Sequence, residues 1–80
     1  MKSTREEIIK VIASVANVET KDLDSGIVSI EELDLDSLQL YELIIDIEEK
    51  YSIRLSDEAI DAVVTVDDFI ELVESFVNKN

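Results

Sequence analysis

One serine stands in a setting that favours modification by another enzyme. Ser37 lies between Asp36 and Leu38 at the expected start of an amphipathic helix, in an acidic chain of 80 residues. The chain contains no histidine and no cysteine, so Ser37 cannot belong to the usual Ser–His or Cys–His catalytic systems. We therefore expect Ser37 to receive a covalent group from a separate enzyme.

Acidic side chains are concentrated around this serine. No basic residue lies between Lys21 and Lys50, whereas ten Asp and Glu side chains do. The formal net charge of −13 would repel the phosphates of nucleic acids and anionic membranes, so neither is expected as a partner. Basic protein partners fit the charge better, and a plain solvated face is the alternative.

Other chemistry has little support in the sequence. Adjacent carboxylates such as Glu48 and Glu49 point about 100° apart on a helix, which does not make an acid–base pair. A calcium loop built around Gly26 would place Lys21 at the first ligand position, where an oxygen ligand is required. Without histidine or cysteine, a zinc site is not expected either. We expect neither an enzyme nor a metal-binding protein.

Length and composition indicate a single globular domain over residues 1–80. Hydrophobic residues make up 46% of the chain, and a chain of this size buries roughly 60% of its unfolded surface. The first seven residues are too polar for a signal peptide, and no apolar run in the sequence is long enough to span a membrane. We expect a monomer in the cytoplasm that is not inserted into a membrane.

Helical periodicity predicts an all-α fold, a small four-helix bundle with three longer helices, one short helix and a long first loop. The first helix should span about Thr4–Ala16, with Thr4 and Glu7 forming a capping box. Residues 17–35 should form a loop that packs against the core, with a helical turn near Ser29. The expected buried face of the first helix comprises Ile8, Val11, Ile12 and Val15.

The second helix should begin at Asp36 or Ser37, both good N-cap residues, and end near Lys50 or Tyr51. At 100° per residue, its expected core face comprises Leu40, Leu43, Ile44, Ile47 and Tyr51. A second, narrower stripe lies outside that face and consists of Leu38, Tyr41 and Ile45. Three carboxylates flank this stripe, namely Glu42, Glu48 and Glu49.

Two more helices should follow. A short one over residues 57–61 would be capped by Ser56 or Asp57. The last should run from Val66 to about Val77, with Thr65 as its N-cap and Asp68 at the third helical position. Its expected buried face comprises Val66, Phe69, Ile70, Val73 and Val77.

The order of these elements, with Asp-Ser-Leu at the second helix, resembles the acyl carrier protein family over nearly the whole chain. The resemblance is strongest in Leu33-Asp34-Leu35-Asp36-Ser37-Leu38, followed by Glu42-Leu43 and Ile47-Glu48-Glu49, and it returns at Asp57-Glu58 and Thr65-Val66. An isolated Asp-Ser-Leu tripeptide is common in proteins and means little by itself. The same tripeptide at the start of the second helix, in an acidic chain of this length, is a specific sign of the family.

The resemblance implies that Ser37 is esterified by a 4′-phosphopantetheine arm, with Asp36 as motif residue and helix N-cap, and that acyl chains travel on the arm as thioesters. It implies as partners a phosphopantetheinyl transferase and the acyl-synthesis and acyl-transfer enzymes, through basic docking patches. The matching partner-recognition positions are Asp36, Leu38, Tyr41, Glu42, Ile45, Glu48 and Glu49.

Several residues depart from the pattern of many fatty-acid carriers. Asp34 stands where those carriers have glycine, Gln39 where they have an acid, Asp46 where they have a small residue and Ser56 where they have proline. Fatty-acid synthesis is the expected pathway. The alternatives are a specialised carrier for polyketide, aminoacyl or modified-lipid synthesis, and an unmodified acidic helical adaptor.

Overall fold

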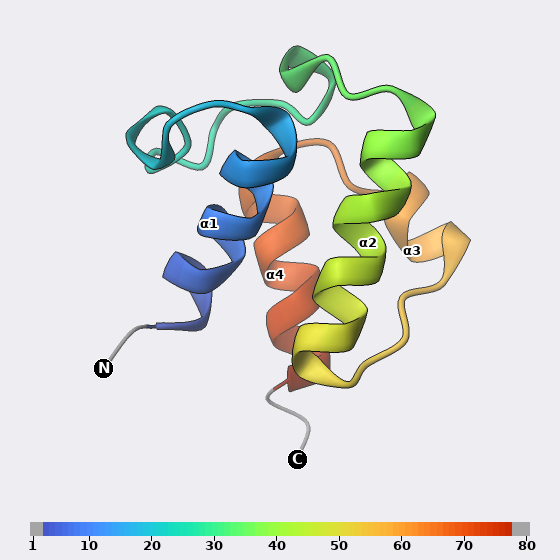
Figure 1. Ribbon diagram of the computed structural model, residues 1–80. Coiled ribbons are helices and arrows are strands. Elements are labelled where there is room, and N and C mark those ends of the chain that lie inside the picture. The colour runs from blue at the N-terminus through green and yellow to red at the C-terminus, as the bar shows by residue number, and fades with distance from the viewer. Residues whose placement is uncertain (1–2, 78–80) are drawn as a thin grey trace.

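The computed structural model describes residues 3–77, and these confirm the predicted all-α bundle. Its helices are α1 (Thr4–Ala16), α2 (Ser37–Tyr51), α3 (Asp57–Asp61) and α4 (Val66–Val77), with two short 3₁₀ helices, η1 (Thr20–Asp22) and η2 (Glu31–Leu33), in the first loop. Helix α1 packs against both α2 and α4 and runs antiparallel to them (Figure 1). None of the helices in residues 3–77 is long and apolar enough to cross a membrane.

This arrangement brings three helix ends together. The C-terminal end of α1 and the N-terminal ends of α2 and α4 lie at one end of the bundle, where the long first loop also crosses (Figure 1). The sequence motif around Ser37 therefore lies beside that loop.

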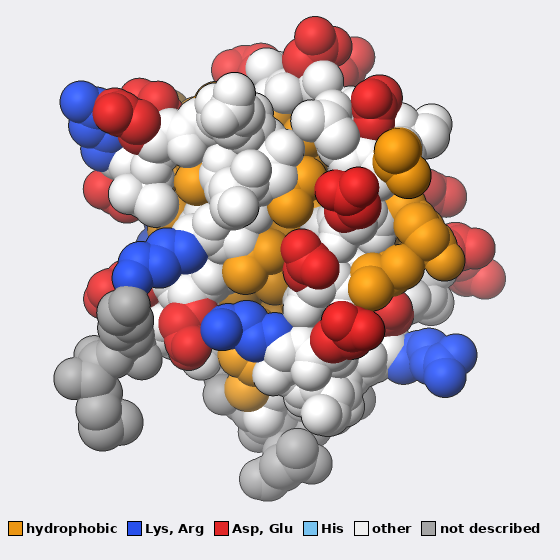
Figure 2. Space-filling view, in the orientation of Figure 1, with side chains coloured by type: hydrophobic (Ala, Val, Ile, Leu, Met, Phe, Trp, Pro, Cys, Tyr) orange, Lys and Arg blue, Asp and Glu red, His pale blue; other side chains and the backbone are white. Residues whose placement is uncertain are grey.

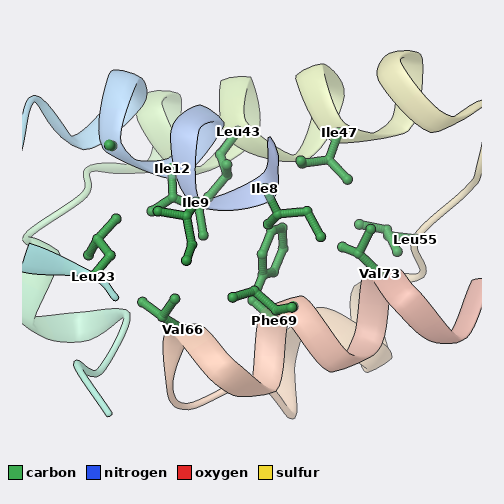
Figure 3. Close-up of a cluster of buried hydrophobic side chains, with 12 residues drawn as sticks. Ile8, Ile9, Ile12, Leu23, Leu43, Ile47, Leu55, Val66, Phe69 and Val73 are labelled. Carbon is green, nitrogen blue, oxygen red and sulfur yellow. The ribbon is translucent and has the colours of Figure 1, made fainter. Parts of the chain in front are cut away.

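The core is built from aliphatic side chains around one aromatic ring. Figure 3 shows Phe69 of α4 pointing toward side chains of α1 and α2, with Leu23 of the first loop and Leu55 of the connection after α2 at its edges. The largest fully buried side chains are Ile8, Ile12, Leu23, Leu43, Ile47, Ile70, Val66 and Val73.

Capping explains where the helices begin. Asp36 caps α2, Ser56 caps α3, and Thr65 accepts a hydrogen bond from the Asp68 N–H at the start of α4, as the sequence predicts. The prediction for α1 was wrong by one residue, because Ser3 and not Thr4 is the N-cap and accepts the Glu6 N–H. The helix nevertheless spans the predicted residues.

The buried face of α1 is rotated from the prediction. Ile9 and Ala13 are buried with Ile8 and Ile12, whereas Val11 and Val15 are half-buried. The apolar arc of this helix is wider than one contact face, so its packing against two helices selects which part is covered. On α4, Val77 is also half-buried.

The first loop is fixed to the start of α4 by its main chain. The N–H of Ile30 donates to the Val64 carbonyl at 2.8 Å, and the N–H of Val66 donates to the Val28 carbonyl at 2.9 Å. These two bonds flank an antiparallel bridge between Ser29 and Thr65. The predicted turn at Ser29 is confirmed as η2, with the Ser29 hydroxyl accepting the Glu32 N–H.

A glycine allows the loop to approach α4 closely. Gly26 has a φ of +75°, and a Cβ added to it would collide with the Asp67 carboxylate. The Gly26 carbonyl accepts the Asp67 N–H at 3.0 Å. Arg5 of α1 pairs with the same Asp67 carboxylate at 2.7 Å and donates to the Asp24 carbonyl at 3.0 Å. Three separate segments thus meet at Asp67.

Candidate modification site and docking surface

Ser37 is the first residue of α2, and it is exposed. Asp36 before it has extended backbone, and its carboxylate accepts the Gln39 N–H at 2.7 Å. In return, the Gln39 side-chain carbonyl accepts the Asp36 N–H at 3.1 Å. These two bonds form a capping box that encloses Ser37 and Leu38. Because Asp36 supplies the cap, the Ser37 hydroxyl is not needed to begin the helix.

The first turn of α2 is suited to hold an anion. Ser37 and Leu38 occupy its first two positions, where backbone N–H groups have no acceptor within a helix. The positive end of the helix dipole adds a favourable interaction of about 0.3–1 kcal/mol with an exposed negative group. A phosphodiester on the exposed Ser37 oxygen fits this environment. The chain has no cysteine, so any thiol at this site must come from the attached group.

The second apolar stripe of α2 lies outside the core, as predicted. Leu38 is 65% exposed and Tyr41 is 62% exposed, which makes them two of the most exposed large hydrophobic residues in residues 3–77. Ile45 is half-buried. Figure 2 shows hydrophobic side chains bordered by acidic ones on the face that α2 presents. This surface, Leu38, Tyr41 and Ile45 with Glu42, Glu48 and Glu49, is called the α2 surface below.

The three carboxylates of the α2 surface are not equivalent. Glu42 and Glu49 are exposed. Glu48 is half-buried, and its carboxylate accepts the N–H of Leu55 at 2.7 Å. Glu48 therefore fastens the connection after α2 in addition to contributing negative charge, a role that the helical pattern did not reveal because its partner lies outside the helix.

An apolar pocket of about 490 Å³ lies close to the start of α2. It is partly open to solvent, and its size is in the range of small-ligand sites. Leu35 and Leu40, which flank the Asp36–Gln39 capping box, both line it, so its wall is next to Ser37 in the chain. Its apolar lining comprises Ile30, Leu35, Leu40, Leu43, Ile60, Val63, Val64 and Phe69.

Two aliphatic residues at the end of α3 and just after it contribute to this lining. Ile60 and Val63 line the pocket, whereas Ile44 and Ile47 of α2 are not in its lining. The sequence did not indicate that Ile30 and Glu31 also line the pocket, because their place beside Val64 depends on the long-range bonds between the first loop and the start of α4.

Asp34 adopts a backbone conformation that explains one departure from the fatty-acid carrier pattern. It caps η2 with a φ of 53°, in the left-handed region that glycine enters without steric cost. Aspartate is among the few other residues that visit this region routinely. Aspartate is therefore compatible with the left-handed backbone at residue 34, and its exposed side chain contributes to the lining of the pocket.

Comparisons with known proteins point to one family. A family model described as "Phosphopantetheine attachment site" matches residues 6–73. The chain is 31% identical to an acyl carrier protein of Buchnera aphidicola, over all of this chain and 98% of that protein. It is 28% identical to an acyl carrier protein of Sinorhizobium fredii, over 92% and 95% of the two chains, and 29% identical to a meromycolate extension acyl carrier protein of Mycolicibacterium smegmatis, over 100% and 85%.

Proposed function

The chain belongs to the acyl carrier protein family, and on that premise we propose that Ser37 carries the family's 4′-phosphopantetheine and delivers acyl intermediates to the enzymes of fatty-acid synthesis. Members of this family hold the group covalently on a serine. The proposed carrier is a single domain over residues 1–80 that acts as a monomer in the cytoplasm. It has no catalytic activity of its own.

The position of Ser37 carries the proposal. Its side chain is exposed at the first turn of α2, and a neighbouring residue, Asp36, provides the cap. Ser37 is thus free to be esterified without loss of the hydrogen bond that begins the helix. The arm supplies the thiol on which acyl groups are held as thioesters. The residues of this chain supply the anchor, the positive helix end and the surroundings of the cargo.

The pocket supports an acyl group as the cargo. Its apolar lining would remove methylene groups from water, with a gain of about 0.8 kcal/mol for each one fully buried. The rim includes Asp34 and Asp61, both exposed, whereas Leu40, Leu43 and Phe69 line it with apolar side chains.

The α2 surface supports docking to basic partner enzymes, the phosphopantetheinyl transferase first among them. Exposed Leu38 and Tyr41 offer apolar contact, and Glu42 and Glu49 provide long-range attraction to Lys and Arg on a partner. Truncation of Leu38 to alanine should mainly speed dissociation, at a cost of about 1–2 kcal/mol for a hot-spot residue.

A specialised carrier is the second candidate. The relatives include meromycolate extension acyl carrier proteins, and Asp34, Gln39, Asp46 and Ser56 all differ from the fatty-acid carrier pattern. A different class, an unmodified acidic adaptor, would use the α2 surface without any group on Ser37. Loading the holo protein with acyl, aminoacyl and polyketide-type groups and measuring turnover by enzymes of each pathway separates the two carrier types.

Intact mass after incubation with coenzyme A and a broad-specificity phosphopantetheinyl transferase tests the modification. We expect one adduct, localised to Ser37 by peptide mapping, and none in Ser37→Ala. Ser25→Ala, at an exposed serine of the first loop, is the matched control and should load like the wild type. An adduct that survives in Ser37→Ala would refute the site, and a folded wild type that never loads would favour the adaptor.

A further inference from the structure

Gln39 joins the start of α2 to the end of α1. Its side-chain N–H donates to the Val15 carbonyl at 3.2 Å, while its side-chain carbonyl accepts the Asp36 N–H and its backbone N–H donates to the Asp36 carboxylate. The bond to Val15 is between residues 24 positions apart. One side chain therefore closes the capping box and fastens it to another helix.

The bond from Gln39 satisfies the Val15 carbonyl, which has no hydrogen-bond donor within α1. The last four carbonyls of a helix have no intrahelical partner, and Val15 is the penultimate residue of α1. The N–H groups of Asn17 and Val18, which follow the helix, both donate to the Ala13 carbonyl. Gln39 thus donates a hydrogen bond to a carbonyl at the C-terminal end of α1, whereas the two residues that follow the helix donate to a different carbonyl.

We propose that Gln39 is a positioning residue for the modification of Ser37. By fastening the capping box to the end of α1, it holds the attachment turn in the one arrangement that a phosphopantetheinyl transferase engages. The inference rests on the proposed role of Ser37. Without the bond to Val15, the turn would populate additional arrangements, and the apparent affinity for the transferase would fall with the fraction that is competent to bind.

Both halves of the amide are required for this role. A glutamate at residue 39 would keep an oxygen to accept the Asp36 N–H, but an ionised carboxylate has no hydrogen to donate to the Val15 carbonyl. It would instead bring two acceptors together where the amide now makes a bond of 3.2 Å. A methionine of similar length would lose both side-chain bonds.

Transferase kinetics with the apo protein as the varied substrate test the proposal, at high salt so that exposed charges are screened. Gln39→Glu, which loses the bond to Val15, should raise KM by up to about fivefold, the effect of one ordinary hydrogen bond. Gln39→Met, which loses both side-chain bonds, should raise KM at least as much, and kcat should be unchanged in both variants. The matched control is Asp68→Ala, which opens the α4 capping box by removing the acceptor of the Thr65 and Val64 N–H groups. It should lower the melting temperature while leaving KM at the wild-type value.

Amide hydrogen exchange supplies a second readout. The Asp36 N–H should exchange faster in Gln39→Met, where its acceptor is gone, but stay protected in Gln39→Glu, where an acceptor remains. A wild-type KM in both Gln39 variants would overturn the positioning role while leaving Ser37 as the attachment site. An equal rise of KM in Asp68→Ala would also overturn it, because general destabilisation would then explain the effect. Failure of the wild type to load would instead refute the proposed function.

Discussion

Saturated acyl groups of increasing length on the Ser37 arm should stabilise the fold in steps. Each added pair of methylene groups that enters the pocket should contribute at most about 1.6 kcal/mol. Because the pocket is partly open, about 0.8–1.6 kcal/mol is expected for each pair. An 80-residue domain changes its melting temperature by about 4–8 °C per kcal/mol. The expected rise is therefore about 3–13 °C for every two carbons.

The rise should stop when the chain has filled the 490 Å³ pocket. Thermal unfolding of the holo protein and of an even-numbered acyl series, followed by circular dichroism, measures both the slope and the plateau. Val63→Phe, which adds a ring to the lining, should move the plateau to a shorter chain. Val11→Phe, at a half-buried residue of α1 outside the lining, should leave the plateau unchanged.

A melting temperature that does not depend on chain length would refute burial of the cargo. It would show that the acyl chain stays in solvent, as a small or polar cargo on a specialised carrier would. An identical shift of the plateau in Val63→Phe and Val11→Phe would refute the pocket as the place of burial, even if stabilisation by the chain were observed.

Four other substitutions test the contacts that support the site. Gly26→Ala should lower the free energy of unfolding by about 2 kcal/mol or more in urea titrations, because the alanine would be strained at positive φ and its Cβ would collide with the Asp67 carboxylate. A loss below about 0.5 kcal/mol would contradict this geometry. Hydrogen bonds from the backbone of Thr65 and Val64 hold the pKa of Asp68 below its usual 3.8, so its ionised form favours the folded state above that value. The wild type should therefore lose more stability than Asp68→Asn as the pH falls from 5 through the lowered pKa, and parallel pH profiles would refute this coupling. Glu48→Lys should lower the melting temperature by removing the bond to Leu55, whereas Glu49→Lys should only slow association with a basic partner; equal melting temperatures would remove the structural role of Glu48.

The parts of the fold that local sequence determines were the parts that could be predicted. Asp36 and Thr65 are capping residues whose partners lie three positions further on, so the starts of α2 and α4 are readable from short segments. The exposed stripe of Leu38 and Tyr41 follows in the same way from helical periodicity. Helix bounds and the exposed face of α2 were accordingly correct.

The features that could not be predicted from the sequence depend on contacts between segments that are distant in the chain. Nothing near Gln39 in the sequence reveals that its amide meets the Val15 carbonyl, and nothing near Arg5 reveals Asp67. The choice of Ile9 over Val11 for the core of α1 likewise depends on where α2 and α4 pack. The pocket likewise depends on contacts between distant segments, because its lining comes from the first loop, α2, the α3 region and α4, so no single segment of the sequence predicts it.

The main-chain bonds between the first loop and the start of α4 also affect the order in which parts of the structure can form during synthesis. Val28 and Ile30 form backbone hydrogen bonds with Val66 and Val64, which are synthesised later than the loop. A nascent chain that ends before α4 can form α1 and α2 from local contacts, but it has nothing to hold the loop that walls the pocket. The attachment serine is therefore synthesised before the segment that fixes the wall of the pocket, and storage of an acyl chain should require α4 as well as α2.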